Sequence, residues 1–342
     1  MKNGPEISVI IPTFNAEPYI ERCIKSIVES KADKSMYEII AVDDSSTDKT
    51  LERLKEIAKS TPHMKVYFRH KSGPGGARNL GMNYAKGRYV MFVDIDDHVD
   101  SKNFSHLVNI LLPLYDQDIV GIDYAKTDES GVISQYCNKL FPYCREMSGA
   151  EYMNSQTPES VLWGYLYRRK FLIDNELKFI EKNIYDHEEF VTRAFCLAQK
   201  IVFLPTQIYY FHHDIKESLS NKPGNTHQEK LVSHHLTIIE VLQKFCFMLG
   251  DPMSEAGLER KLDFSAATIV KRVILRNYEE EFIKGAINNL QNIGLYPLRK
   301  EAGYGLRYRV LRRSTNSTGK IFWWRQHNSS PLVKPVAKYI FG

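Results

Sequence analysis

Three carboxylates lie within four positions at the end of a short apolar run. Residues 90–93 are followed by Asp94-Ile-Asp96-Asp97. Carboxylates this close repel one another and raise one another's pKa unless a cation lies between them. Hard oxygen ligands of this kind suit Mg²⁺ or Mn²⁺, and either ion also bridges phosphates. The motif therefore predicts a divalent metal site, with a solvated acidic turn as the alternative interpretation.

A second acidic cluster ends another apolar run. Residues 37–42 are followed by Asp43 and Asp44, and a polar stretch continues to position 48. Thr47 or Asp48 is expected to cap the helix that follows. Asp43 and Asp44 stand one step earlier, at the strand end, where a carboxylate can accept a hydrogen bond from a nucleobase or a ribose. The two clusters together place acids at two strand ends.

A glycine-rich stretch, Gly73-Pro-Gly75-Gly76-Ala77-Arg78, is expected to form a turn after a third strand. Such a turn, then a helix and an acidic strand end about 20 residues later, is also the layout of a dinucleotide site. Arg78 occupies the position of that motif's third glycine and favours a bidentate phosphate contact or a pairing with a nearby acid. A phosphotransferase with Asp94 as nucleophile is a further alternative, although His98-Val99 stands where such enzymes carry Gly-Thr.

The first 125 residues alternate between strand and helix patterns. Strands are expected at 7–11, 37–42, 64–68 and 89–93. Helices are expected at 18–30, from the second acidic cluster to residue 58, and at 77–85. This alternation predicts an α/β fold with a mostly parallel open sheet flanked by helices. Ligands of such sheets bind beyond the carboxyl ends of the strands. Thr13 and both acidic clusters fall there, which predicts one nucleotide-sized crevice.

Composition narrows the class of protein. The formal net charge is only +5 over 342 residues, which argues against a dedicated nucleic-acid binder. The chain has five cysteines, and they show no CxxC spacing, so neither a disulfide framework nor a zinc site is expected. This use of cysteine predicts a cytoplasmic location. No signal peptide is expected from the first residues, and no membrane span is expected, because no run of about 18 apolar residues occurs in the sequence.

The remaining chain is expected to form two regions. Residues 1–220 are expected to form the nucleotide-binding and catalytic domain, and residues 221–342 a mainly helical C-terminal region. That region ends in a basic and aromatic segment that includes Arg307, Trp323 and Trp324. Arg beside Trp suits an anionic membrane surface. Packing on the first domain and a contact between copies in a homo-oligomer are the open alternatives.

Four sequence blocks resemble the inverting family 2 glycosyltransferases, whose GT-A fold is a Rossmann-like, mostly parallel sheet. They are Ser8-Val-Ile-Ile-Pro-Thr-Phe-Asn15, Val42-Asp-Asp-Ser-Ser-Thr-Asp48, Gly75-Gly-Ala-Arg-Asn-Leu-Gly81 and Gly87-Arg-Tyr-Val-Met-Phe-Val-Asp-Ile-Asp-Asp97. The resemblance is strong over residues 7–125 and looser to about 220.

The resemblance implies a nucleotide-sugar site. Its members are expected to be Pro12, Thr13, Asn15, Asp43, Asp44, Arg78, Asp94 and Asp96. Asp44 would contact the base, and Asp96 would lie near the ribose and the metal. Asp97 would be a direct ligand of Mn²⁺ or Mg²⁺. The metal would stabilise the departing diphosphate.

Two further segments carry expectations from the resemblance. Residues 184–190 stand where the family supplies its general base, so Asp186 is the expected base and Glu188 the second choice, with helix capping as the alternative. Residues 209–213 resemble a loop over the diphosphate, in which His212 or His213 would bind phosphate or metal.

The resulting expectation is a glycosyltransferase that moves a sugar, expected to come from a UDP-sugar, onto an acceptor hydroxyl in surface polysaccharide assembly. The acceptor would be a saccharide or a lipid-linked saccharide, reached at the inner face of the membrane. A non-catalytic nucleotide-sugar-binding module and an NAD(P)-dependent oxidoreductase are the alternatives. No nucleic-acid partner is expected.

Overall fold

The computed structural model of the 342-residue chain describes residues 4–128, 131–137, 143–156, 160–212, 225–276, 278–300, 304–327, 330 and 333–341. The chain divides into two compact units. The first combines Met1–Tyr152 with Pro158–Ser218, and the second combines Met153–Thr157 with Leu219–Gly342. The predicted boundary between residues 220 and 221 lies outside the described residues.

The first unit begins with the predicted parallel strands. They are β1 (Ile7–Thr13), β2 (Tyr37–Asp43), β3 (Met64–Phe68) and β4 (Tyr89–Phe92). They lie in the order β3-β2-β1-β4, and all three neighbouring pairs are parallel. Every residue of β1 and of β4 is buried. Continuous apolar runs are typical of strands covered on both faces, so the α/β prediction is confirmed.

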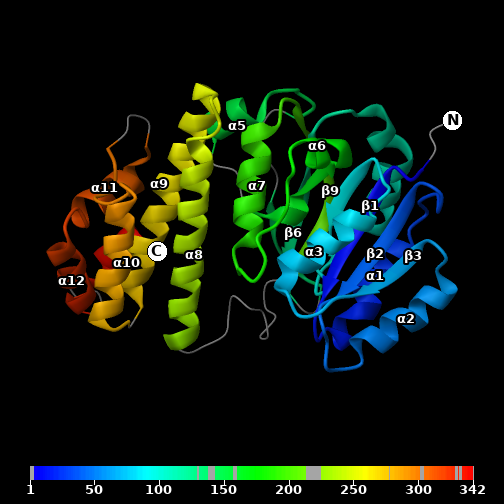
Figure 1. Ribbon diagram of the computed structural model, residues 1–342, viewed down its shortest axis with the longest axis horizontal. Helices are drawn as coiled ribbons and strands as arrows, with labels where there is room; N and C mark the ends of the chain where they lie inside the picture. Colours follow the sequence, from blue (N-terminus) through cyan, green and yellow to red (C-terminus); the bar gives the residue numbers. More distant parts are fainter. Residues whose placement is uncertain are drawn as a thin grey trace. The chain divides into compact units, whose positions relative to one another are not determined.

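Three helices connect these strands (Figure 1). They are α1 (Ile20–Val28), which follows the 3₁₀ turn η1 (Glu17–Tyr19), then α2 (Thr50–Ser60) and α3 (Gly73–Tyr84). Crossovers between parallel strands are right-handed, so the reversal of strand order after β3 places α3 on the sheet face opposite α1 and α2. The direction in which successive strands are added to the sheet reverses between β1 and β4. Ligands of open α/β sheets bind at such a point.

The glycine-rich stretch differs from its prediction. Residues 73–76 were expected to form a turn, but they are the first turn of α3. Asp44 explains the difference, because its carboxylate accepts hydrogen bonds from the backbone N–H groups of Ser72 and Gly73, both at 2.8 Å. A side-chain oxygen placed there satisfies the unpaired donors of a helix N-terminus.

The second half of the sheet is mixed. Its strands are β5 (His98–Val99), β6 (Ile119–Thr127), β7 (Ile133–Cys137), β8 (Tyr165–Arg168) and β9 (Ile201–His212). β8 lies antiparallel between β4 and β6, and β9 is parallel to β6. Residues 209–212, which resembled a loop, are therefore strand. The 3₁₀ turn η4 (Leu162–Gly164) directly precedes β8.

The other helical segments of this unit connect and cover these strands. They are α4 (Ser101–His106), η2 (Leu107–Leu111), η3 (Leu112–Leu114), α5 (Gly149–Ser155, whose last residues belong to the second unit), α6 (Arg169–Asp174) and α7 (Asp186–Leu197).

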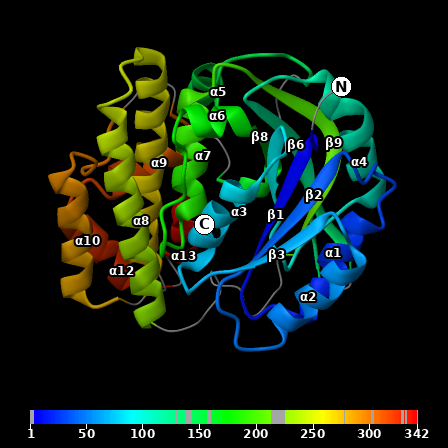
Figure 2. The same cartoon turned by 45° about the vertical axis from the view of Figure 1, so that its right-hand side comes forward.

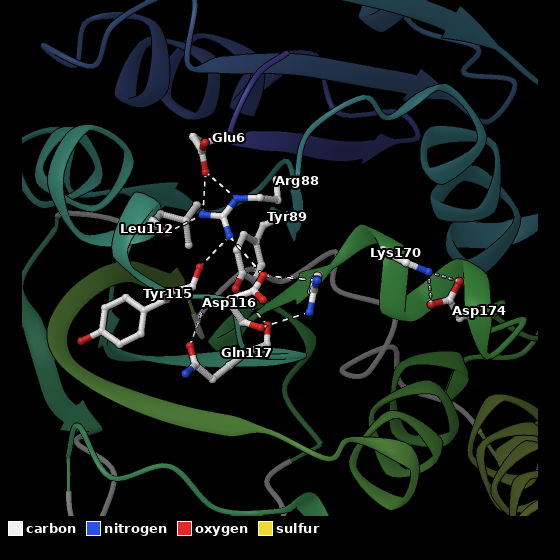
Figure 3. A network of polar contacts seen from close by, with 10 residues as sticks. Glu6, Arg88, Tyr89, Leu112, Tyr115, Asp116, Gln117, Lys170 and Asp174 are labelled. Atoms are coloured by element: carbon white, nitrogen blue, oxygen red, sulfur yellow. Dashed lines mark hydrogen bonds and ion pairs between the residues drawn. The ribbon is translucent and has the colours of Figure 1, made fainter. Parts of the chain in front are cut away.

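A partly buried network fixes the amino end of β4 (Figure 3). The Arg88 guanidinium donates to Glu6 Oε2 from Nε at 2.7 Å and to the carbonyl of Leu112 at 2.5 Å. The hydroxyl of Tyr89 donates to the carbonyl of Gln117 at 2.9 Å. These contacts tie β4 to β1 and to the segment before β6, so the strand that ends at the acidic cluster is held at its start.

The second unit is mainly helical, as predicted. Its helices are α8 (Asn225–Cys246), α9 (Pro252–Leu275), α10 (Glu280–Asn292), α11 (Leu306–Ser314), α12 (Thr318–His327) and α13 (Lys334–Phe341). α8 and α9 lie side by side (Figure 2). Asp251 caps α9 by accepting from the Ser254 N–H at 2.9 Å, and Pro252 opens the helix. Among the described residues, no helix is both long and apolar enough to cross a bilayer.

Candidate active site

The carboxyl ends of β1, β2 and β4 meet at one edge of the sheet. Thr13 pairs in register with Asp43, and the N–H of Asp44 donates to the Thr13 carbonyl at 2.9 Å. Pro12 and Thr13 are the last two residues of β1, and both are buried. Asp94 follows β4, the strand beside β1. The predicted residues of the nucleotide pocket therefore start from adjacent strands.

Asp43 and Asn15 shape the loops above these strands. The two oxygens of Asp43 accept from the hydroxyl and the N–H of Ser46, at 2.5 and 3.1 Å. Asn15 Oδ1 accepts from the Thr47 N–H at 2.8 Å. Asn15 and Ser45 have φ values of 46° and 66°, a left-handed conformation that such local hydrogen bonds stabilise. The loops after β1 and β2 are therefore joined.

The N-cap residue of α2 is Lys49, which makes no side-chain capping bond, and the predicted caps Thr47 and Asp48 stand before it. Asp48 Oδ1 accepts from the Thr50 N–H at 3.0 Å and Oδ2 accepts from the Glu17 N–H at 3.2 Å. Thr47 instead contacts Asn15.

Arg78 is the buried centre of the site. Its Nη1 donates to Asp186 Oδ2 and its Nη2 donates to Asp94 Oδ1, both at 2.9 Å. Burial lowers the pKa of the guanidinium, but the charges of Asp186 and Asp94 outweigh that effect and raise it. Arg78 therefore stays charged and joins the end of β4 to the start of α7. Of its two expected partners, a phosphate or an acid, the structure supplies the acids.

The acidic turn after β4 is held by β9. Asp97 is 1% exposed, and its carboxylate accepts from the Tyr209 hydroxyl at 2.6 Å and the His212 N–H at 2.8 Å. Burial, followed by the charges of Asp96 and Asp94, raises the pKa of Asp97 well above its ordinary value. Burial and then Asp94 raise the pKa of Asp96 to about 6. Burial and crowding therefore disfavour the charged forms of Asp96 and Asp97 when no cation is near.

This cluster fits a divalent cation in part. Asp96 and Asp97, whose pKa values are raised, gain from a nearby positive charge. In the part of the chain that the structure describes, no three His, Cys, Asp or Glu side chains converge on a metal position. Mg²⁺ in nucleotide sites is held by one or two carboxylates together with phosphate oxygens. Asp96 and Asp97 supply that number, and a diphosphate would complete the shell.

His212 lies in a strand rather than in a loop. Its Nε2 is 2.9 Å from His98 Nδ1, and its Nδ1 is 3.2 Å from the Thr127 hydroxyl. Burial and then the His212 ring lower the pKa of His98 to about 4. The structure thus brings the backbone N–H of His212, and not its ring, to Asp97. The metal role of the His212 ring stays a prediction, and His213 lies outside the described residues.

The two residues predicted as bases lie at the start of α7, and both are buried. Asp186 is 1% exposed and Glu188 is 7% exposed. Asp186 packs against α3, where a Cβ on Gly75 would lie 2.7 Å from its Oδ2. Only glycine leaves room for this approach.

Several residues around the site were not predicted from the sequence. Tyr209 donates to Asp97 and accepts from the Asp94 N–H at 3.1 Å. Arg22 donates to the Asp96 carbonyl at 2.5 Å from α1. Ser72 donates its hydroxyl to Asp44 at 2.9 Å. Tyr209 lies in the segment that resembled a loop, which was the one available signal. Nothing in the sequence around Arg22 and Ser72 marks them.

Comparisons with known proteins agree with this geometry. The family model for glycosyl transferase family 2 matches residues 8–174. GlyG, a glycosyltransferase of Streptococcus pneumoniae, is 30% identical over 214 residues, which are 60% of this chain and 70% of GlyG. EpsJ of Bacillus subtilis, described as an uncharacterized glycosyltransferase, is 30% identical over 223 residues, 61% of this chain and 62% of EpsJ.

A third relative is also known in three dimensions. TarS of Staphylococcus aureus, a poly(ribitol-phosphate) beta-N-acetylglucosaminyltransferase, is 27% identical over 209 residues, 60% of this chain and 35% of TarS. The crystal structure of TarS 1-349 with UDP-GlcNAc superposes with a TM-score of 0.64 and 21% identity, over 98% of this chain and 90% of that one. The match extends over less than two thirds of EpsJ and of TarS. The chain belongs to the family 2 glycosyltransferases and has their GT-A fold.

Proposed function

We propose that the protein transfers a sugar from a nucleotide-diphosphate sugar to an acceptor hydroxyl, with inversion at the anomeric carbon. The observation that carries this proposal is the pair of bonds from Arg78 to Asp94 and Asp186. These two bonds hold Asp94, which follows β4 where the donor is expected to bind, close to the start of α7, which is expected to supply the base. Holding donor and base in one geometry lowers the entropic part of the barrier.

The donor we propose is a UDP-sugar. TarS, which has the same fold, has been solved with UDP-GlcNAc and with UDP. Pro12, Thr13, Asn15, Asp43 and Asp44 would line the nucleotide pocket. Both Asp44 oxygens already accept bonds from the start of α3, so a base contact there would use their remaining lone pairs.

We propose that the transfer depends on Mn²⁺ or Mg²⁺ held by Asp96 and Asp97. The bound ion would supply Lewis-acid stabilisation of the diphosphate that leaves. The chain's own part is to place these carboxylates. Tyr209 and the His212 N–H orient Asp97, while Arg22 holds the backbone at Asp96.

The acceptor we propose is a saccharide or lipid-linked saccharide in the assembly of a surface polysaccharide. The name of TarS supports it, since poly(ribitol-phosphate) is the polymer on which that relative acts. An oxidoreductase and a phosphotransferase have no support once the family is known. A nucleotide-sugar-binding module without turnover is the outcome that would replace the proposal.

We further propose that the protein works at the inner face of the cell membrane and contacts it through α11, α12 and α13. No acidic residue follows Glu301 in the sequence. The exposed basic side chains on these helices are Arg307, Arg309, Arg313, Lys320, Lys334 and Lys338, which we call the C-terminal basic surface. Trp323 and Tyr339, 47% and 49% exposed, lie among them. Basic and aromatic side chains together suit anionic headgroups, and a homo-oligomer contact is the alternative.

Calorimetry tests the donor site first. UDP, GDP and CDP are titrated into the full chain with and without Mn²⁺. The Asp96→Asn variant is titrated in the same way. Glu56→Gln is the control, because Glu56 is exposed and forms an ion pair at the surface. The proposal predicts metal-dependent binding of one nucleotide that the Asp96 variant weakens and the control keeps. No binding of any nucleotide under either condition would contradict it.

A further inference from the structure

The proposed transfer needs a group that takes the proton of the acceptor hydroxyl. The first four residues of α7 all have this chemistry: Asp186, His187, Glu188 and Glu189. A general base must come within hydrogen-bond reach of the hydroxyl it deprotonates. Exposure and existing bonds therefore decide among the four.

The three acids are turned into the protein. Asp186 and Glu189 are 1% exposed, and Glu188 is 7% exposed. Both oxygens of Asp186 are engaged, Oδ2 by Arg78 at 2.9 Å and Oδ1 by the N–H of His187 at 2.8 Å. Glu189 is paired with Arg193 of its own helix through both oxygens. All three acids are therefore buried, and the carboxylates of Asp186 and Glu189 are already engaged by other groups.

His187 differs from its three neighbours. Its side chain is 35% exposed, and its Nδ1 lies 3.5 Å from Asp186 Oδ1. A carboxylate beside Nδ1 stabilises a proton there and leaves the lone pair on Nε2. The imidazole is thus the one basic group of this segment that an acceptor can reach, and a buried carboxylate on its far side can stabilise the imidazolium.

We propose that His187 is the general base of the transfer and that Asp186 is a positioning residue, not the base. This inference rests on the proposed function. The acceptor oxygen forms a bond to the anomeric carbon as the bond from that carbon to the diphosphate breaks. The bonding electron pair leaves with the nucleoside diphosphate. The acceptor proton moves to His187 Nε2 and from there to solvent.

Three groups lie near the His187 ring. They are Asp186 on α7, the ring of Tyr185 with its centroid 6.4 Å away, and Arg78 of α3 beyond Asp186. A general base must be unprotonated to accept the proton, so turnover is expected to fall as the pH is lowered.

The test compares turnover with binding. UDP release from UDP-glucose, UDP-galactose and UDP-N-acetylglucosamine is measured with Mn²⁺ and a membrane extract as the source of acceptor, for the full chain, His187→Gln and His187→Asp. His106→Gln on α4, an exposed histidine outside the site, is the matched control. We expect His187→Gln to lower kcat by about 10²- to 10⁴-fold, with the Kd for UDP changed less than about twofold. His187→Asp should recover part of the rate, with its acid limb moved to about pH 4.

Four results would overturn the inference, and they are separable. Turnover by His187→Gln at the wild-type rate leaves the transfer standing and removes His187 as the base. An unchanged acid limb in His187→Asp, or a parallel loss of UDP affinity in His187→Gln, assigns the residue a structural role. A wild-type chain that binds UDP but consumes none of the donors overturns the proposed function, and the inference with it.

Discussion

Replacement of Arg78 by methionine should destabilise the protein strongly. Arg78 is 6% exposed and its partner Asp186 is 1% exposed. The side chain of Asp94 is 32% exposed, so water can replace most of what it loses. Removing one partner of a buried ion pair leaves an uncompensated charge and costs about 3–5 kcal/mol. The expected loss therefore comes mainly from Asp186.

Thermal unfolding gives the magnitude. For a domain of about 150–250 residues, 1 kcal/mol lowers Tm by about 2–4 °C, so Arg78→Met should lower it by roughly 6–20 °C. Arg53→Met is the control, because Arg53 is 45% exposed and pairs with Glu21 and Glu56 at the surface. Exposed pairs contribute at most about 1 kcal/mol, so the control should shift Tm by less than about 4 °C.

A double variant separates the charge from the packing. Arg78→Met with Asp186→Leu replaces the buried pair by apolar groups, which is often neutral for stability. It should recover most of the lost Tm without recovering UDP release. A Tm for Arg78→Met within the range of the Arg53 control would refute the reasoning, because the pair would then contribute no more than a surface contact.

Four more predictions follow from other contacts. Asp44→Ala removes the acceptor of three hydrogen bonds that Ser72 and Gly73 donate and should lower the unfolding free energy by about 1–2 kcal/mol; an unchanged denaturant midpoint contradicts this. Gly75→Ala places a Cβ 2.6 Å from the Ile180 carbonyl and should cost about 1–3 kcal/mol, whereas Gly285→Ala in open space on α10 should not destabilise. Mn²⁺ should raise Tm more at pH 7 than at pH 5, because Asp96, with its pKa raised to about 6, is ionised only at the higher pH; equal gains at both pH values, or a gain retained in Asp96→Asn, count against the metal site. Replacing Arg307, Arg309 and Arg313 by glutamine should weaken binding to phosphatidylglycerol vesicles about a hundredfold, from about 1 kcal/mol per residue, while the same change at Lys55, Lys59 and Lys65 should not; equal effects, or no vesicle binding by the wild type, contradict a membrane role.

The strand ends could be predicted from sequence because their signal is local. An apolar run followed by acids marks β2 and β4, and β3 was predicted with the bounds Met64–Phe68 that it has. Burial on both faces produces such runs whatever lies elsewhere in the chain. The acidic groups therefore fell at the correct edge of the sheet.

The contacts that complete the site join distant parts of the sequence. Asp44 caps α3 from 28 residues away, which is why residues 73–76 were predicted as a turn. Arg78 and Asp186 are 108 positions apart. The sequence does not single out His187. The pattern of a helix shows which of its faces is apolar, but it does not show which of two neighbouring polar side chains another element buries. Asp186 was predicted as the base because its burial against α3 cannot be predicted from the sequence around it.

Consumption of a nucleotide sugar tests the central claim most directly. The purified chain is incubated with Mn²⁺ and UDP-glucose, UDP-galactose or UDP-N-acetylglucosamine, with a membrane extract as the source of acceptor, and UDP and the labelled sugar product are measured. We predict that one donor is consumed, that its sugar enters the acceptor fraction, and that Arg78→Met abolishes both. UDP binding without consumption of any donor would contradict the claim and identify a binding module in place of an enzyme.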